Sequence, residues 1–338
     1  MATFVLRQST RTWRGVRPLD PRRDLPQVAD LIEEAFAGEL DLGGQAALRE
    51  LRLAGRLGIW MMPSHLLGGE WPENFGGFVW VEDGRVVGNV TVQRSDSFAR
   101  RWQIANVAVA SAYRRRGIAR ALMETALEHV RAQGGTWVVL QVRADNTAAR
   151  QLYERLGFDA IAGTCDLFRP RARGEAIPTT PDEGPPLVPL TANEWREVYE
   201  LATVALPALA QWWQPLRPYR FQIAIEQQIG EWLSRLIGWS RTWRLGWREE
   251  EQLRIALSAR AERWRGPHRL EIWVHPACRG RWEAAIIGQA LRRLATYPPR
   301  AIAVQTDTDN QPLIEALQAA GFQARRTLIT MRRLVNPE

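Results

Sequence analysis

Lysine is missing from this sequence, so all 45 of its basic residues are arginines. We interpret this absence as a compositional bias that carries no mechanism. With 37 acidic residues the formal net charge is +8, a balance that suits nucleic acid, an acidic lipid surface or an anionic cofactor. The arginines are spread along the chain, and we find no zinc finger, RNP motif or basic tail. We therefore expect no nucleic-acid partner.

Cysteine and long apolar runs are also scarce. The two cysteines, Cys165 and Cys278, lie far apart in the sequence and have neither a metal-ligand nor a C-x-x-C spacing. No apolar run approaches the roughly 18 residues of a membrane-spanning helix. Residues 1–8 lack the apolar core and the cleavage pattern of a secretory signal. These absences lead us to expect a cytoplasmic protein with reduced cysteines, no metal and no membrane partner.

The length of 338 residues is long for one domain and sufficient for two, and an apolar content of 46% can fill ordinary cores. Residues 169–186 are rich in proline, glycine and charge and have no periodicity, so we place a linker there. This divides the chain into a first half, residues 1–168, and a second half, residues 187–338.

The centre of the sequence is a basic turn between a predicted strand over residues 104–110 and a predicted helix over residues 118–133. Its sequence is Arg114-Arg115-Arg116-Gly117-Ile118-Ala119-Arg120. The first turn of a helix has N–H groups without partners and a partial positive charge. Glycine lets a ligand approach the backbone closely. A strand, a basic turn and a helix N-terminus in this order predict an anion site.

Other elements of the first half follow from periodicity and turn residues. Alternating apolar strands flank Asp83-Gly84, which predicts a hairpin. Apolar residues at helical spacing predict two early helices, and short apolar runs predict further strands. The expected elements are an extended segment over 13–18, helices over 24–35, 45–57 and 146–156, and strands over 78–81, 86–92, 137–142 and 158–167.

A second motif begins about thirty residues after the basic turn and contains Asn146, Ala149, Leu152-Tyr153 and Gly157-Phe158. Together the two motifs resemble the GNAT superfamily of N-acetyltransferases over residues ~75–168. The basic turn is similar to the pyrophosphate turn of that family, which reads Arg or Gln, x-x-Gly-x, then Gly or Ala. The second motif is similar to its Asn-x-x-Ala-x-x-Leu-Tyr-x-x-x-Gly-Phe helix. The text around residues 137–158 looks closest to the RimI type, the ribosomal-protein alanine acetyltransferases.

The resemblance implies an α/β (α+β) fold in which helices flank a mixed, mostly antiparallel sheet with a splayed central parallel strand pair. It implies acetyl-CoA as co-substrate, no metal, and direct attack by a primary amine of a small molecule or a peptide. Asn146 also suits a helix N-cap, and the two roles are compatible. The implied cofactor-binding residues are Val107, Ala108, Val109, Arg114, Arg115, Arg116, Gly117, Ile118, Ala119, Arg120 and Asn146.

The resemblance also implies the catalytic roles. A strand N–H near Val107 would stabilise the oxyanion, and Tyr153 would act as general acid, although a buried tyrosine on a helix also suits a core position. In the RimI type the strand before the asparagine helix reads Leu-Glu-Val-Arg and its glutamate is the base. Here Gln141 occupies that position and cannot accept a proton.

Three replacements for the base stay open: a water chain, an acceptor amine of low pKa, or a residue from 39–70. We expect residues 57–73 to form one wall of the acceptor pocket or, alternatively, to fill the core. The candidate bases in this part of the chain are Glu39, Asp41, His65 and Glu70.

The second half repeats the first with its site altered. Asn310 and Gly321-Phe322 follow Asn146 and Gly157-Phe158 by 164 residues, and Trp282 follows Gly117 by 165, which predicts a tandem GNAT protein. Trp282 would fill the space of a pyrophosphate, Glu283 adds negative charge, and Leu317 replaces Tyr153. We expect this half to bind no acetyl-CoA in the usual way and to serve as a scaffold, a lid or a homodimer surface.

Three functions remain open at this point. The first is an N-acetyltransferase whose first half is catalytic. The second is an enzyme similar to mycothiol synthases, a tandem family whose active half is the second one. The third is a non-catalytic acetyl-CoA sensor, which a missing base would permit. The sequence also leaves open which strand closes each sheet, because each half offers only one strand after its Gly-Phe; residues 1–8 are a candidate edge.

Overall fold

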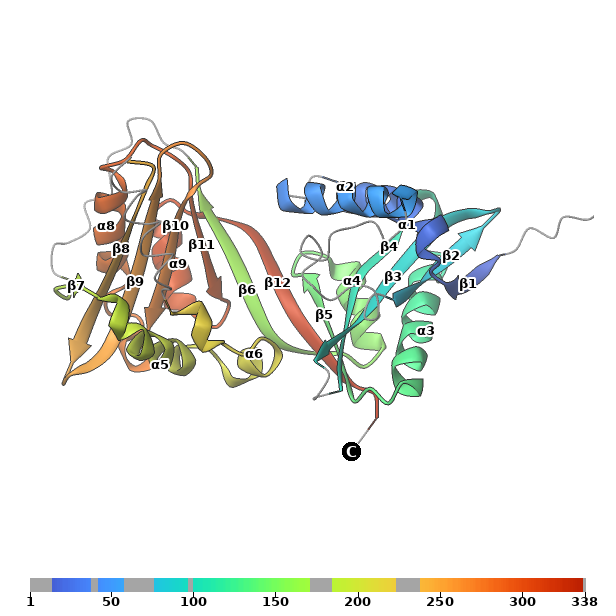
Figure 1. Cartoon of the computed structure of the whole chain (residues 1–338). Coiled ribbons are helices and arrows are strands. Elements are labelled where there is room, and N and C mark those ends of the chain that lie inside the picture. The colour runs from blue at the N-terminus through green and yellow to red at the C-terminus, as the bar shows by residue number, and fades with distance from the viewer. Residues whose placement is uncertain are drawn as a thin grey trace, which may run out of the picture. The chain divides into compact units, whose positions relative to one another are not determined.

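The computed structural model describes residues 14–37, 42–57, 76–96, 100–170, 184–222 and 238–336. Packing divides the chain into two compact units, whose elements are labelled in Figure 1. The first unit comprises residues 1–141, 152–159 and 332–338, and the second comprises residues 142–151 and 160–331. The linker over 169–186 stays a prediction, since most of it lies outside the described residues.

The first unit begins with a strand and two helices and continues with a sheet. Its elements are β1 (Gly15–Pro18), α1 (Pro21–Ala35), α2 (Leu42–Leu57), β2 (Gly76–Glu82), β3 (Arg85–Asp96), β4 (Arg101–Val109), α3 (Ile118–Ala132) and most of β5 (Trp137–Arg143). The hairpin prediction is confirmed: Asp83 and Gly84 both have positive φ, 53° and 76°, as a two-residue hairpin turn requires.

Helix α1 begins three residues earlier than predicted. Asp20 accepts the Arg22 N–H at 3.0 Å as the N-cap, and Pro21 occupies the first helical position. Asp24 is therefore inside the first turn, fully buried, where it binds the Arg17 guanidinium through two oxygens at 2.6 and 2.7 Å. This pair joins β1 to α1.

Opposite faces of the first sheet carry different helices. A Cβ added to Gly88 would lie 2.9 Å from Ile118 Cγ2 and 3.0 Å from Leu122 Cδ1, so this face of β3 packs against α3. The next residue, Asn89, pairs with Ala108, and Ala108 belongs to the core formed with α1 and α2. Since successive strand residues point to opposite faces, α1 and α3 cover opposite sides of the sheet.

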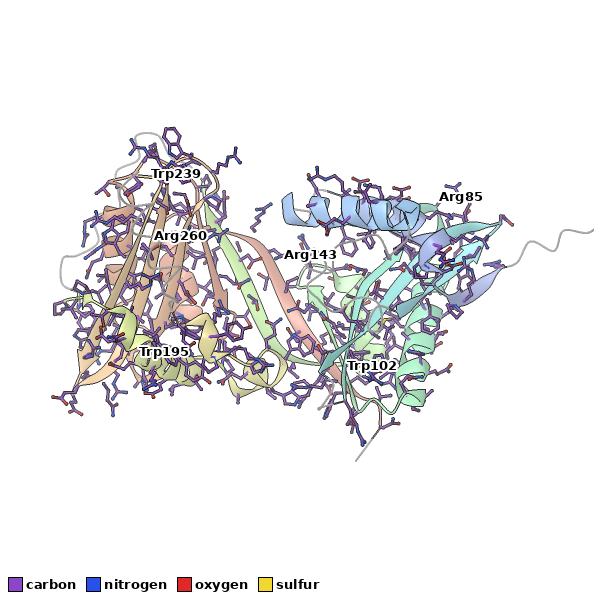
Figure 2. The ribbon with its side chains drawn as sticks, in the orientation of Figure 1. Arg85, Trp102, Arg143, Trp195, Trp239 and Arg260 are labelled. Carbon is purple, nitrogen blue, oxygen red and sulfur yellow. The ribbon has the colours of Figure 1, made fainter. Side chains whose placement is uncertain are left out.

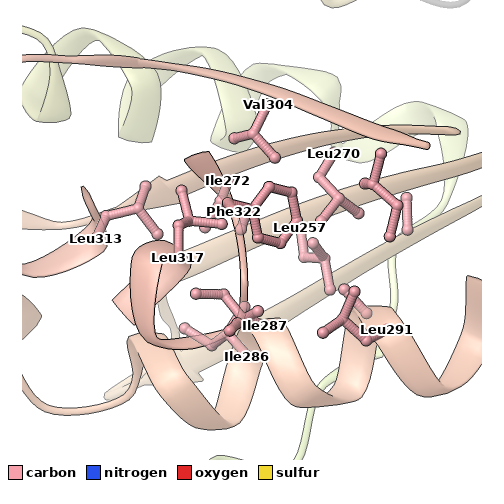
Figure 3. Packing of buried hydrophobic residues seen from close by; sticks show 14 of the residues in the cluster. Leu257, Leu270, Ile272, Ile286, Ile287, Leu291, Val304, Leu313, Leu317 and Phe322 are labelled. Carbon is pink, nitrogen blue, oxygen red and sulfur yellow. The ribbon is translucent and has the colours of Figure 1, made fainter. Parts of the chain in front are cut away.

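The second unit has a similar sequence of elements. They are β6 (Asp159–Arg169), β7 (Val188–Pro189), α5 (Trp195–Ala205), α6 (Ala208–Trp213), β8 (Ser240–Glu249), β9 (Gln252–Glu262), β10 (His268–Val274), α8 (Glu283–Leu294), β11 (Ile302–Asp307), α9 (Gln311–Ala319) and β12 (Gln323–Leu334), with α4 (Thr147–Arg155) divided between the units. In its core, Leu257 and Ile272 of the sheet pack with Ile286 and Ile287 of α8 and Leu317 of α9 (Figure 3).

The strand order answers which strand closes each sheet. It runs β1-β2-β3-β4-β5-β12-β6-β11-β10-β9-β8-β7. The strand after the first Gly-Phe, β6, pairs antiparallel with β11 of the second half over Thr164–Arg169. The strand after the second Gly-Phe, β12, lies next to β5, and the Ala144 N–H donates to Thr327 O at 2.8 Å. The suggested edge over residues 1–8 lies outside the described residues.

Arginine side chains come from many elements in the described residues. Arg85 lies on β3, Arg143 on β5 and Arg260 on β9 (Figure 2).

Among the helices of the described ranges, none combines the length and the apolar character of a membrane span.

Candidate active site

A slot opens between β4 and β5. The two strands are parallel and pair only from Arg101 with Trp137 to Ile104 with Leu140. Beyond these pairs β4 continues to Val109, still bonded to β3 on its other side. Among the described strands, none pairs with this edge of the carboxyl-terminal part of β4, which confirms the predicted splay of the parallel pair.

A β-bulge on β4 determines which backbone groups face this slot. Asn89 pairs with Ala108 and Thr91 pairs with Ala105, so Asn106 and Val107 together oppose one residue of β3. Asn106 has φ 50°, a left-handed conformation that asparagine tolerates better than most residues. The Ala110 N–H donates to Val87 O at 2.9 Å on the β3 side. By strand alternation the N–H groups of Val107 and Val109 point to the slot, and that of Ala108 points to β3.

The basic turn presents open amides. Arg115 and Gly117 have positive φ, 64° and 78°, and the first helical bond of α3 joins Ala121 N–H to Gly117 O at 3.0 Å. The N–H groups of Ile118, Ala119 and Arg120 thus lack acceptors within the helix, and no side chain caps it among the described residues. A Cβ added to Gly117 would meet no heavy atom within 4 Å, so this side of the turn is open. We call these amides the first cup.

The side chains of the turn are less available than the amides. Arg114 Nε donates to Val109 O at 3.1 Å, and Arg116 donates to Ala112 O at 3.0 Å and lies 3.9 Å from Glu82. Arg120 pairs with Glu124 one helical turn later. Within the described ranges, Arg115 alone of these four has a guanidinium without a protein partner. Anion binding at the first cup therefore depends on backbone N–H groups and on Arg115.

Tyr153 lies in the same unit as β4 and the first cup. Its side chain is 6% exposed, and its ring is 6.1 Å from that of Phe158. Burial raises the pKa of Tyr153 to about 12, because the phenolate would lose its hydration. The hydroxyl is therefore protonated at any working pH and can donate a hydrogen bond.

Asn146 precedes α4, and Gln141 lies on β5. Asn146 Oδ1 accepts the Ala149 N–H at 3.1 Å, which confirms the N-cap interpretation, while its role toward a cofactor stays a prediction. Gln141 is exposed on β5, and neither β4 nor β5 carries a carboxylate. The candidate bases Glu39, Asp41, His65 and Glu70, and nearly all of the predicted pocket wall over 57–73, lie outside the described residues.

The corresponding turn of the second half is closed by its own side chain. Gly280 corresponds to Arg115 and also has a positive φ, 81°. Trp282 corresponds to Gly117 but has φ −130° in place of a positive φ. Glu283, only 3% exposed, accepts the Gly280 N–H at 2.8 Å and the Trp282 N–H at 3.1 Å. Trp282 itself packs against the core, and Leu317 is fully buried there. We call this turn the second cup.

Sequence reasoning missed the polar residues beside the slot. Asn89 Nδ2 donates to Asn106 O at 3.0 Å, and both asparagines approach Thr91 Oγ1, at 3.5 and 3.4 Å. The available signal was an asparagine inside the mainly apolar stretch of each of two strands. A polar residue at such a position often marks an interruption of the ladder, as the bulge at Asn106 does.

With this geometry established, residues 46–158 match the model of the acetyltransferase (GNAT) family. This segment is a GNAT domain. Named relatives agree: the chain is 37% identical over 93 residues to N-alpha-acetyltransferase 30 of Schizosaccharomyces pombe, covering 26% of this chain and 59% of that protein. It is 48% identical over 56 residues to the mycothiol acetyltransferase of Corynebacterium glutamicum strain R, which is 17% of this chain and 19% of the relative.

A third relative is the ribosomal protein bS18-alanine N-acetyltransferase of Escherichia coli K12, at 44% identity over 54 residues, covering 16% of this chain and 36% of the relative. The chain thus spans less than two thirds of the length of these curated relatives. The RimI-type resemblance of the matched segment is confirmed by this relative.

Solved structures show the tandem GNAT fold. A GCN5-related N-acetyltransferase from Sphaerobacter thermophilus aligns with TM-score 0.58 at 16% identity over 96% of both chains. A tandem GNAT protein from the clavulanic acid biosynthesis pathway aligns with TM-score 0.51 at 19% identity, over 96% of this chain and all of that one. The predicted fold class of two tandem GNAT folds is confirmed.

Proposed function

We propose that residues 1–168 form an acetyl-CoA-dependent N-acetyltransferase and that residues 187–338 form a GNAT-like half without a working cofactor site. One observation carries this proposal: the first cup is open beside a splayed slot, whereas the second cup is closed by Glu283. Free backbone amides at a helix N-terminus suit the pyrophosphate of coenzyme A.

Each residue predicted for the site has a place in this function. The amides from Arg115 to Arg120 would hold the pyrophosphate, with Arg115 adding its side chain and Gly117 keeping the turn open. The backbone of Val107–Val109 would pair with the pantetheine arm as a further strand, and Asn146 would contact the arm. Each exposed contact at a helix end contributes only about 1 kcal/mol, so affinity has to come from many contacts.

The reaction is attack of a neutral amine on the acetyl carbonyl. A C–N bond forms, the carbonyl oxygen becomes an oxyanion near the Val107 N–H, and the C–S bond then breaks to release the thiolate. Tyr153 would donate its proton to that sulfur, and the proton released from the amine nitrogen would return to Tyr153 through water. A positioned acid of this kind typically contributes roughly 10²–10⁴-fold.

Neither β4 nor β5 carries a carboxylate that could remove the proton from the amine. We propose that the acceptor reaches the slot as the free base, with its proton taken up by water. The rate should then follow the pKa of the chosen amine. Measuring pH–rate profiles for two amines of different pKa would test this, because the inflection should move with the pKa of the amine. An inflection at the same pH for both amines would indicate an enzyme base instead.

A second function is favoured by the same missing carboxylate: acetyl-CoA binding without catalysis, as in a sensor. A mycothiol-synthase-like division of labour, with the second half active, conflicts with the closed second cup. Both free cysteines are buried, which suits a reducing compartment such as the cytoplasm. A homodimer stays a prediction, which light scattering on the purified chain would test.

The deciding experiment combines calorimetry with thiol release. Acetyl-CoA should bind with one site per chain, and free thiol should appear when small amines and short peptides are added in turn. Binding without thiol release above hydrolysis for any acceptor would favour the sensor. No binding, or two equivalent sites, would contradict the proposed function.

A further inference from the structure

Asn89 is a polar side chain in the core of the first unit. It is 0% exposed, and its Nδ2 donates to the main-chain oxygen of Asn106 at 3.0 Å. Its Oδ1 is buried and has no hydrogen-bond partner among the residues that the structure describes. The orientation of the amide is determined by chemistry, because a carbonyl oxygen can only accept and so must face the nitrogen.

The bond from Asn89 fixes one peptide plane. The Asn106 C=O and the Val107 N–H belong to the same peptide group, which is planar and trans, so the two point in opposite directions. Since Asn89 lies on β3 and holds the oxygen toward that strand, the Val107 N–H points away from β3. The direction away from β3 is the β5 side, where β4 has no partner after Ile104.

An independent contact gives the same direction. The Ala110 N–H bonds to Val87 O on β3, and counting back by strand alternation puts the Val107 N–H on the slot side. Asn106 has a left-handed backbone and lies in the bulge, where the regular hydrogen bonds between β3 and β4 are interrupted. The ladder therefore constrains the Asn106–Val107 peptide plane less than its neighbours. A side-chain bond to its oxygen is therefore the contact that restricts rotation of the plane.

The second half lacks both partners of this arrangement. The residue of β9 that corresponds to Asn89 is Ala256, which pairs with Trp273 as Asn89 pairs with Ala108. No register shift interrupts the β9–β10 ladder, and no residue of β10 has positive φ. Where the bulge is missing, the asparagine that would hold it is missing as well.

As a polar residue in the core, Asn89 contributes less to stability than an apolar side chain would. A buried acceptor without a partner costs roughly 1–3 kcal/mol. Residues kept at such a cost are concentrated at functional sites. The contact with Asn106 gives a reason for its presence that apolar packing does not.

We propose that Asn89 is a positioning residue for catalysis: it holds the Asn106–Val107 peptide so that the Val107 N–H is aimed at the oxygen of the acetyl thioester. This inference rests on the proposed function, because it requires acetyl-CoA in the slot. Asn89 itself touches neither substrate nor cofactor. Its effect should appear in carbonyl polarisation and turnover and not in cofactor affinity.

The test uses acetyl-CoA labelled with ¹³C at the carbonyl, bound to the full chain. In the wild type the bound carbonyl should shift downfield of the free one, as a hydrogen-bonded carbonyl does. Asn89→Ala and the shape-conserving Asn89→Leu should lose most of this shift and lower kcat by about 10- to 100-fold, below the roughly 10²–10³-fold for outright loss of an oxyanion donor. The dissociation constant of acetyl-CoA should change less than about threefold.

Thr91→Val is the matched control, because it removes a buried hydroxyl from the same cluster and leaves the Asn106 oxygen bonded. Its carbonyl shift and kcat should stay near those of the wild type. An unchanged carbonyl shift in both Asn89 variants would overturn the proposal, as would a loss of kcat that tracks a loss of Tm across all three variants. If the wild type does not bind acetyl-CoA, the proposed function itself fails.

Discussion

The two cups of this chain have related backbones and opposite states. In the first, Gly117 at φ 78° begins α3 with free amides, and in the second, Trp282 at φ −130° begins α8 with Glu283 bonded to the turn. A carboxylate attached to the helix supplies the negative charge that a ligand would otherwise bring. The comparison teaches that an anion site can be closed by an internal anion without changing the fold around it.

The largest effect should come from the acid that only the first half has. Tyr153→Phe should lower kcat by roughly 10²–10⁴-fold, since the sulfur loses its proton donor, with little change in acetyl-CoA affinity. Leu317→Tyr is the matched change in the second half and should restore no second activity. Steady-state kinetics with calorimetry would check both. Full turnover in Tyr153→Phe would remove this residue from the mechanism.

Placing a tryptophan in the first cup, as in the second, should remove the main difference in cofactor binding between the two halves. Gly117→Trp forces a bulky residue into left-handed backbone, at about 1–2 kcal/mol, on the side of the turn that is open in the wild type. Acetyl-CoA affinity should fall by at least about tenfold, because the ring occupies the open side of the turn and the strained turn relaxes away from the shape that binds the ligand. Calorimetry on Gly117→Ala separates the two terms. Equal affinity in Gly117→Trp and the wild type would contradict the assigned pyrophosphate position.

Removing the internal anion should destabilise the second unit without creating a cofactor site. Glu283→Ala exposes the amides of α8, and loss of such a cap costs about 0.5–2 kcal/mol. Denaturant unfolding should show this loss, and added sulfate should recover part of it. Glu283→Gln serves as control, because its amide oxygen can still accept. Tight acetyl-CoA binding by the Glu283→Ala second cup would show that one carboxylate alone distinguishes the halves.

The smallest effect is an alkaline one. The pKa of Tyr153 is raised from 10.0 to about 12 by burial, so the fold favours the neutral phenol. Its stabilising contribution is complete below pH 10 and is lost as pH rises from 10 to about 12, at most about 2–3 kcal/mol. Tyrosinate absorbance of the wild type minus that of Tyr153→Phe should rise near pH 12. A difference that rises near pH 10 would show an exposed hydroxyl.

How much the sequence revealed differs between local and long-range features. The Asp83-Gly84 hairpin and the start of α3 at Ile118 were predictable, because turn residues and periodicity are local. The pairing of β6 with β11 was not, since it joins residues far apart in the sequence, from Arg169 with Ile302 to Thr164 with Asp307. Helix α1 began early because Asp20 and Pro21 form a cap that the apolar pattern does not include.

The candidate site divides in the same way. The basic turn, Tyr153 and the altered second cup could be identified from motifs and offsets. The Asn89–Asn106 contact could not, because it joins two strands through a bulge that adds one residue to the ladder. Glu283 was expected to repel an anion, and the structure shows that it also occupies the turn amides itself.

The most direct test of the central claim is a co-crystal structure of the full chain with coenzyme A. The pyrophosphate should lie against the amides around Gly117, with the pantetheine arm along Val107–Val109, while Glu283 stays bonded to Gly280 and Trp282. Nucleotide density in the second half and none in the first would contradict the account.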